Sequence, residues 1–366
     1  MRISSHKTNN YWLSILLLMG ISLLTACQSA VTQDDVDRVR ARVKTSQLAS
    51  QEICVDSFIP HKLSFANGLR VREIGLYINN GSGLAVNDLD NDGDLDIVFA
   101  AIDREVGIFW NQGNLGFEEE RLDEKFPRGA ATVDVDGDGN LDLVFSQRGL
   151  RGLTFWRNQG KVVDGSRFVL DELPGVEAYA YTQAWGDVDG DGDLDLVTGS
   201  YNVELIQNGI ALPERDPRAG VFYYENTPEG FIPQRLALSA ETLSIALVDL
   251  DHDGYKDLWV ANDFDLQDLI WLWKNDRWQA AAPFQQTPHS TMSTEWGHIT
   301  NDERLALFST DMMPYDHSPE TEAAWGPVME SMMMMAESNN SSKTREPLPR
   351  QPSRSASWQA STTPSR

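Results

Sequence analysis

Asp187-Val188-Asp189-Gly190-Asp191-Gly192-Asp193-Leu194-Asp195 is the segment on which the fold prediction rests. It carries Asp at positions 1, 3, 5 and 9 and Gly at position 6. Three other segments share this spacing, and they begin at Asp88, Asp134 and Asp249. Successive copies therefore begin 46, 53 and 62 residues apart. A motif that recurs at such intervals predicts a repeat architecture.

The four acidic loops are predicted calcium sites. Carboxylates crowded into nine residues repel one another, and hard oxygen ligands suit Ca²⁺ better than a metal that prefers thiolates. Solvated acidic turns are the alternative, because Asp, Asn and Gly commonly form turns, but four copies with one spacing favour the metal. The predicted ligands are the side chains at positions 1, 3, 5 and 9, the carbonyl at position 7, and water. The predicted metal residues are Asp88, Asp90, Asp92, Asp94, Asp96, Asp134, Asp136, Asp138, Asn140, Asp142, Asp187, Asp189, Asp191, Asp193, Asp195, Asp249, Asp251, Asp253, Tyr255 and Asp257.

The loops differ from EF-hand loops, which need a bidentate Glu at position 12. That position holds Phe99, Phe145, Thr198 and Val260. Short apolar, β-prone segments flank each loop, and they are too short for the helices of an EF-hand. Each loop is therefore predicted to join two strands. Because position 7 would bind through its carbonyl, the side chains of Asp94 and Asp193 are expected to face solvent.

An aromatic segment follows each loop and ends in Asn. These segments end at Asn111, Asn158, Asn226 and Asn275, and a further aromatic residue follows each, at Phe117, Phe168, Phe231 and Trp278. The pattern predicts three to four short strands in each unit, with the aromatic residues packed between sheets. Four-stranded units of this length are typical of β-propeller blades.

The chain resembles the FG-GAP/VCBS repeat family over about residues 60–316, and within it the bacterial cartilage-acidic-protein-like group. The resemblance implies an all-β fold, a β-propeller with Ca²⁺ on hairpins within the blades. It also implies a mostly non-enzymatic role in adhesion or recognition. About five units are visible, which is incomplete relative to the seven blades common in this family.

The fifth unit keeps the strand frame and loses most of the acidic loop. His298 stands at position 1, Thr300 at position 3 and Ala306 at position 9, and only Asp302 keeps its place. We predict no calcium there and interpret His298 as a surface turn residue rather than a transition-metal ligand. Residues 69–78 are a candidate outer strand that closes the ring; without closure, an exposed sheet edge would favour oligomerisation or instability.

The N-terminus is predicted to be a lipoprotein signal peptide. Arg2 and Lys7 precede an apolar run at residues 12–24, which is too short to favour a spanning helix. The sequence Leu24-Thr25-Ala26-Cys27 resembles a lipobox, so Cys27 is the predicted lipidation site. The resemblance implies a lipid anchor in the bacterial cell envelope, on the outer membrane if the host is Gram-negative. An uncleaved signal anchor is the alternative.

Five segments are predicted along the chain: a signal peptide at 1–26, a tether at 27–57, propeller repeats at 58–316, a helical or apolar insertion at 317–337, and a disordered basic tail at 338–366. The insertion contains Met332 to Met335, which we interpret as packing residues rather than copper ligands. A truncated or frameshifted C-terminus would explain why the fifth unit lacks outer strands.

Composition narrows the possible functions. The formal net charge of −25 disfavours nucleic-acid binding. No nucleophile–base pair or zinc spacing is present, so no catalytic residue is assigned and no cofactor besides Ca²⁺ is expected. The leading hypothesis is a surface-anchored recognition module for a protein or glycan. The alternatives are a polysaccharide-acting enzyme or accessory subunit, since abundant carboxylates leave room for a glycosidase pair, and a truncated, non-functional family member.

Overall fold

The computed structural model describes residues 60–63, 65, 83–101, 104–263, 266–284, 287, 288, 290–298 and 306–312. The chain divides into two compact units, Met1–His61 and Lys62–Arg366, and the described strands all lie in the second. The predicted signal peptide, Cys27, the tether, the candidate strand at 69–78, the Met-rich insertion and the basic tail lie outside the described residues. Among the described helices, none is long and apolar enough to cross a membrane.

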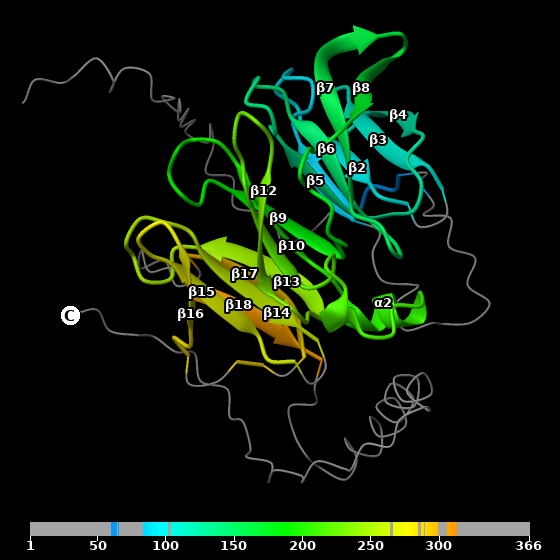
Figure 1. The fold of residues 1–366 in the computed structure, drawn as a ribbon. Coiled ribbons are helices and arrows are strands. Elements are labelled where there is room, and N and C mark those ends of the chain that lie inside the picture. Colours follow the sequence, from blue (N-terminus) through cyan, green and yellow to red (C-terminus); the bar gives the residue numbers. More distant parts are fainter. Residues whose placement is uncertain are drawn as a thin grey trace, which may run out of the picture. The chain divides into compact units, whose positions relative to one another are not determined.

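Four antiparallel sheets of four strands each correspond to the four predicted units, which we call the first to fourth repeats (Figure 1). The first repeat contains β1 (Leu84–Asn87), β2 (Asp96–Phe99), β3 (Val106–Asn111) and β4 (Phe117–Leu122). The second contains β5 (Pro127–Val133), β6 (Asp142–Gln147), β7 (Leu153–Val163) and β8 (Ser166–Asp171). The third contains β9 (Thr182–Gly186), β10 (Asp195–Gly199), β11 (Val221–Glu225) and β12 (Ile232–Ala237). The fourth contains β13 (Thr242–Val248), β14 (Asp257–Asn262), β15 (Leu269–Trp273) and β16 (Trp278–Ala281).

Each acidic loop joins the first two strands of its sheet, as predicted. The residue before the loop pairs with position 9 in every repeat: Asn87 with Asp96, Val133 with Asp142, Gly186 with Asp195, and Val248 with Asp257. Strands that follow one another along the chain are neighbours in each sheet. The prediction of an all-β fold with short strands around each loop is therefore confirmed; closure into a ring and the number of blades stay predictions.

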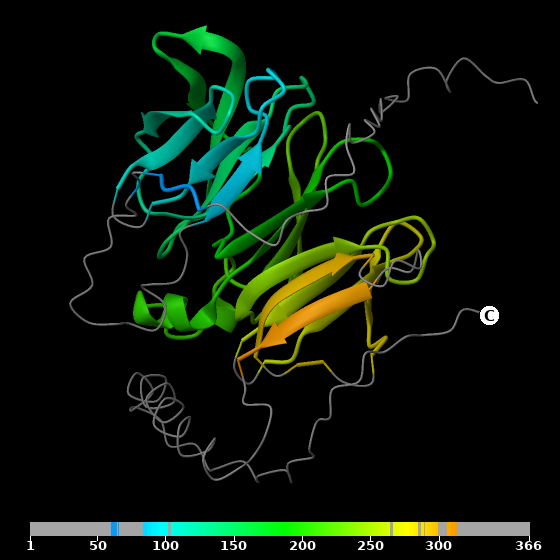
Figure 2. The same cartoon turned by 180° about the vertical axis from the view of Figure 1, so that it is seen from behind.

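A fifth, two-stranded sheet contains β17 (Thr291–Gly297) and β18 (Ala306–Asp311). Gly297 pairs with Ala306, the same register that the complete repeats use around their loops. Figures 1 and 2 show this pair beside β13 and β14, and residues of β17 contact both strands. The predicted strand frame of the fifth unit is present, and His298 is exposed at the end of β17. Asp302 and its loop lie outside the described residues, so the predicted lack of calcium there stays a prediction.

The cores lie between successive sheets. Leu143, Phe145 and Phe168 of the second repeat pack with residues of β2 and β3 in one apolar cluster. Phe222, Tyr224 and Phe231 of the third repeat share a cluster with residues of β5 to β7, and Trp271, Trp273 and Trp278 of the fourth share one with β10 and β11. Face-to-face packing of this kind is how amphipathic sheets bury their apolar residues. The predicted core role of the aromatic strands is confirmed.

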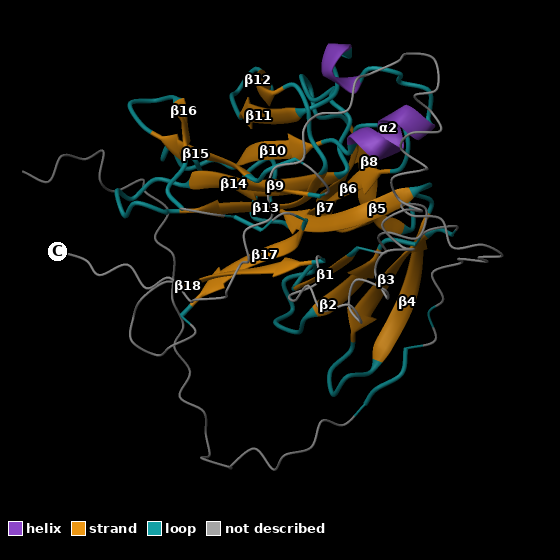
Figure 3. Cartoon of the chain, turned by 90° about the horizontal axis from the view of Figure 1, so that it is seen from below, coloured by secondary structure: helices purple, strands orange, loops and turns teal. Residues whose placement is uncertain are grey.

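One helical segment interrupts the third repeat. The insertion between β10 and β11 forms the short helix α2 (Asn202–Gln207) and the 3₁₀ turn η2 (Pro213–Arg215) (Figure 3). Glu204 of α2 forms a buried ion pair with Arg128 of β5, with Nη2 and Oε1 2.6 Å apart. The Arg128 guanidinium also lies over the Tyr181 ring, 3.9 Å from its centroid. These contacts join the insertion to the second repeat.

Candidate metal centre

Two left-handed backbone positions shape every acidic loop. The Gly at position 6 has φ between 88° and 101° in the four loops, a conformation that Gly adopts without steric cost. Position 4 also has positive φ, and it holds Asn91, Gly137, Gly190 and His252. Asn tolerates this region better than most residues, which fits the turn composition of the motif. Gly at position 6 therefore permits the tight turn of each loop.

Carboxylates at positions 1 and 5 fold the loop back on itself. In the first loop the Asp88 carboxylate accepts the N–H groups of Asp92 and Gly93 at 3.1 and 3.0 Å, and the second and fourth loops repeat this pattern. In all four loops the position 5 carboxylate accepts the N–H of position 7. The third loop differs at position 1, because Asp187 accepts the N–H of Gly190 instead, at 2.7 Å.

The position 9 Asp, which we call the anchor carboxylate, holds the loop to the rest of its sheet. Asp142 is fully buried, and its two oxygens accept the N–H of Val135 at 3.0 Å and of Asn158 at 2.7 Å. The other anchor carboxylates, Asp96, Asp195 and Asp257, make the equivalent pair of bonds. One bond reaches loop position 2 and the other reaches the third strand or the residue that follows it. The sequence predicts position 9 as a metal ligand and does not predict this structural role.

The Asn after the aromatic strand completes the attachment in three repeats. The side-chain amides of Asn111, Asn158 and Asn226 donate to the carbonyl of loop position 8 at 3.1, 2.9 and 3.2 Å. In the fourth repeat the residue that donates its N–H to the anchor carboxylate is Trp273, at 2.9 Å. Trp273 therefore stands where the other repeats have Asn. The sequence prediction that Asn275 is the equivalent of those Asn residues is therefore wrong by two positions. Asn275 lies in the turn before β16.

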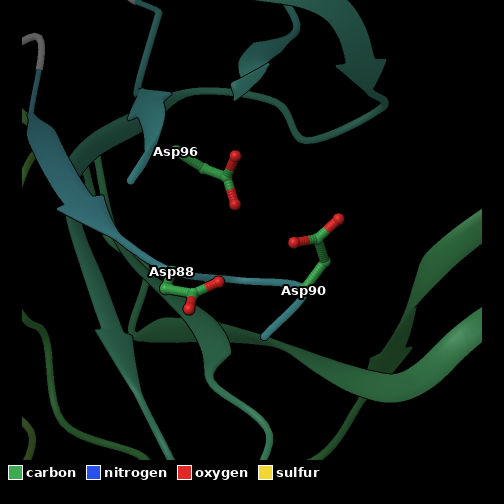
Figure 4. Close-up of side chains that lie close together, drawn as sticks. All are labelled: Asp88, Asp90 and Asp96. Atoms are coloured by element: carbon green, nitrogen blue, oxygen red, sulfur yellow. The ribbon is translucent and has the colours of Figure 1, made fainter. Parts of the chain in front are cut away.

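Carboxylate oxygens converge within each loop. Figure 4 shows Asp88, Asp90 and Asp96 of the first loop pointing toward one another. One oxygen from each of these residues lies within 4.8 Å of the others, and the same holds for three carboxylates in each remaining loop. The second and fourth loops use positions 1, 3 and 9, namely Asp134, Asp136, Asp142 and Asp249, Asp251, Asp257; the third uses positions 1, 3 and 5, namely Asp187, Asp189 and Asp191. Acidic groups arranged in this way could bind a metal ion.

Two oxygens in these loops are shielded from solvent yet accept no hydrogen bond from the described part of the chain. They are Oδ1 of Asp90 and Oδ1 of Asp193. A buried acceptor without a donor is costly, and a cation would satisfy it. The residues present therefore fit a bound cation.

The Asp193 side chain is only partly exposed, so the expectation that it faces solvent is wrong, whereas Asp94 is exposed as expected.

Burial and mutual repulsion disfavour full ionisation of the loops. Desolvation first, and then repulsion from neighbouring carboxylates, raise the pKa of Asp142 and of Asp193 to about 7. Desolvation raises the pKa of Asp195 to about 6, although backbone N–H groups oppose it. The pKa values of Asp136 and Asp189 are raised for the same two reasons, burial first. A nearby cation would reverse these shifts, because an opposite charge favours the ionised carboxylate.

A cavity of about 360 Å³ opens beside the third loop, between residues of the third and fourth repeats. Its lining residues are Asp189, Gly190, Asp191, Glu225, Trp273 and Asp276. Four of these six are acidic, so the surroundings of the third loop add negative charge to that of the loop itself.

A match to a known protein family agrees with the repeat over part of the chain. Residues 88–145 and 134–198 match the FG-GAP-like repeat, and these stretches contain the first three loops. The predicted FG-GAP-like repeats are thereby confirmed over those residues. No curated protein matches this chain. Among solved structures, the V. cholerae biofilm matrix protein Bap1 is similar with a TM-score of 0.33 and 14% identity, over 63% of this chain and 35% of that one. The chain thus spans about a third of the length of that relative.

Proposed function

We propose that this chain is a calcium-stabilised recognition module of the cell envelope, built on FG-GAP-like repeats. The observation that carries the proposal is the convergence of carboxylates in each acidic loop, with donor oxygens within 4.8 Å of one another. Like charges at this separation repel strongly when partly buried, and a divalent cation converts that repulsion into attraction. Ca²⁺ fits a short, flexible loop of oxygen ligands.

Calcium would supply charge compensation and rigidity to the loops. The convergent side chains would hold the ion, at positions 1, 3 and 9 in the first, second and fourth loops and at positions 1, 3 and 5 in the third, because their oxygens lie within 4.8 Å of one another. An ion that binds the folded chain and not the unfolded chain stabilises it by about 2.7 kcal/mol per site at a hundredfold excess over Kd. We assign recognition of a protein or glycan to the loops of this scaffold, with no catalytic residue.

The metal role is tested by calorimetric titration of the full chain with CaCl₂, together with thermal melting in calcium and in chelator. We expect saturable binding and a melting temperature that falls in chelator. Asp136→Asn, at position 3 of the second loop, should remove one binding equivalent. Asp171→Asn is the matched control, since Asp171 lies in the same repeat and pairs with Arg157 outside the loop, at 2.8 Å. No binding and no effect of chelator would refute the metal role.

The recognition role is tested by incubating the chain with envelope extracts and arrayed glycans in calcium and in chelator. Partners retained only in calcium support a binding module, whereas shortened glycans would identify a polysaccharide-acting enzyme instead. The lipid anchor at Cys27 and the cartilage-acidic-protein-like relationship remain predictions. The mass of the mature protein tests the anchor, because a mass without diacylglycerol on Cys27 would exclude it.

A further inference from the structure

The fourth acidic loop already contains a cation of its own. The Lys274 ammonium lies 2.5 Å from Oδ2 of Asp251, at loop position 3, and it also donates a hydrogen bond to Asp253, at position 5. Both carboxylates are among the predicted calcium ligands. Ammonium–carboxylate contacts of this kind are charge-assisted and stronger than neutral hydrogen bonds. The Lys274 side chain is 27% exposed and both carboxylate side chains are 32% exposed, so the contact lies at the protein surface.

The register of the fourth sheet explains why Lys274 reaches the loop. Trp273 donates its N–H to the anchor carboxylate Asp257, as Asn111, Asn158 and Asn226 do in the other repeats. Lys274 therefore follows at the position that holds Gln112, Gln159 and Thr227 elsewhere. All three of those residues are uncharged. The lysine is thus a feature of the fourth repeat, carried by the strand register, and not a general property of the motif.

The other described basic residues near the acidic loops make weaker contacts with the loop carboxylates. Arg157 of the second repeat forms its ion pair with Asp171, at 2.8 Å, and interacts with Asp136 of its own loop only through longer-range electrostatics. Arg167 approaches Asp90 of the first loop only to 3.9 Å, the outer limit of an ion pair. The Lys256 ammonium, within the fourth loop, lies 5.7 Å from the centre of the Trp296 ring. Lys274 differs from these because it contacts two ligand carboxylates of one loop.

We infer that Lys274 is the built-in counter-cation of the fourth loop, so that this loop stays free of calcium and the chain binds three Ca²⁺ ions instead of four. A divalent ion would have to break both lysine contacts and then lie beside a positive charge, whereas the described ion pair of Arg167 with Asp90 in the first loop is much longer, at 3.9 Å. The inference rests on the proposed calcium role of those three loops. It assigns the fourth loop a calcium-independent structure in which Lys274 offsets part of the negative charge.

The number of calcium equivalents bound by the full chain, measured by isothermal titration calorimetry, tests this directly. We expect three equivalents for the wild type and four for Lys274→Gln, which installs the residue that the first two repeats have at this position. Lys274→Arg keeps a cation there and should remain at three. Arg157→Gln is the control for loss of a basic residue outside a loop, and it should also remain at three.

A second pair of variants keeps the test decisive if Lys274→Gln fails to fold. Asp251→Asn changes position 3 of the fourth loop and should leave three equivalents, whereas Asp136→Asn changes the same position of the second loop and should leave two. Four equivalents in the wild type, or one equivalent lost in Asp251→Asn, would overturn the inference while supporting the calcium role. Three equivalents in a folded Lys274→Gln would also overturn it.

An absence of binding separates the two claims. If the wild type binds none and Lys274→Gln binds one, the counter-cation role stands and the calcium role of the other loops fails. If neither protein binds calcium, both claims fail.

Discussion

The anchor carboxylate of the second loop should contribute more to folding than to metal binding. Asp142 is fully buried and accepts two backbone N–H bonds, at 3.0 and 2.7 Å, from Val135 and Asn158. Asp142→Ala leaves both amides buried without a partner, and each costs about 1–3 kcal/mol. Removing the carboxyl also removes its own desolvation cost, so we expect a net loss of about 3 kcal/mol in the free energy of unfolding.

The measurement is urea denaturation followed by far-ultraviolet circular dichroism, in excess chelator so that metal binding does not contribute. Asp138→Ala is the matched control, because Asp138 is an exposed predicted ligand in the same loop and accepts the exposed N–H of Asn140. We expect this control to lose less than about 1 kcal/mol, the usual value for an exposed hydrogen bond. In saturating calcium both variants should lose the additional stability that one bound ion supplies.

Equal destabilisation of the two variants in chelator would refute this reasoning. It would mean that the backbone bonds to Asp142 contribute no more than a solvated loop contact. Asp142→Asn provides an intermediate case, since its amide oxygen can keep one of the two bonds while its NH₂ group opposes the other N–H. Its loss should therefore fall between those of Asp142→Ala and Asp138→Ala.

Two further predictions concern buried acids outside the loops. Burial, together with the nearby charge of Asp263, raises the pKa of Glu241 to about 8 despite the N–H of Val203, which favours its ionised form. The folded chain therefore holds a proton on Glu241 that the unfolded chain releases near pH 4.5, so the free energy of unfolding should fall by a few kcal/mol as pH rises from about 4.5 to about 8. Urea denaturation at pH 5 and at pH 8 should show this decrease. A Glu241→Gln variant with the same decrease would contradict the prediction. Glu204→Ala removes one member of the buried pair with Arg128 and should cost about 3–5 kcal/mol in the same assay. The exposed pair of Arg157 and Asp171 is its control, and Asp171→Ala should cost at most about 1 kcal/mol.

The sequence predicts the local structure around the loops well because the relevant signals are local. A Gly at position 6, acidic residues at fixed spacing and short apolar flanks together specify a strand, a tight loop and a second strand. The structure has that unit four times, with one register. The aromatic residues that follow are apolar on both faces of the sheet, which predicts their burial between neighbouring sheets.

The features that the sequence did not predict depend on partners distant along the chain or on exact register. The helix α2 is short and lacks a side-chain N-cap, and its position depends on Glu204 meeting Arg128, 76 residues away. The fourth repeat contains an Asn near the expected place, so only the strand ladder shows that Trp273 occupies it. A shift of two residues leaves side chains on the same face of a strand, and hence no alternation pattern reveals it. Lys274 was missed for the same reason.

The fifth unit clarifies what the anchor carboxylate does. Ala306 occupies position 9 there, yet Gly297 and Ala306 still pair in the register of the complete repeats. Pairing of the first two strands therefore does not require the carboxylate. In the four complete repeats one oxygen of the anchor carboxylate accepts the N–H of loop position 2, and the other accepts an N–H of the third strand or of the residue that follows it. Within the described residues, the fifth sheet has only two strands. The Asp at position 9 thus links the loop to the third strand. In the fifth unit Ala306 replaces this Asp, and the described residues of that unit contain no third strand. The Asp spacing accordingly contains two signals: the carboxylates at positions 1 and 3 converge in every loop as candidate metal ligands, and the carboxylate at position 9 ties the loop to the third strand.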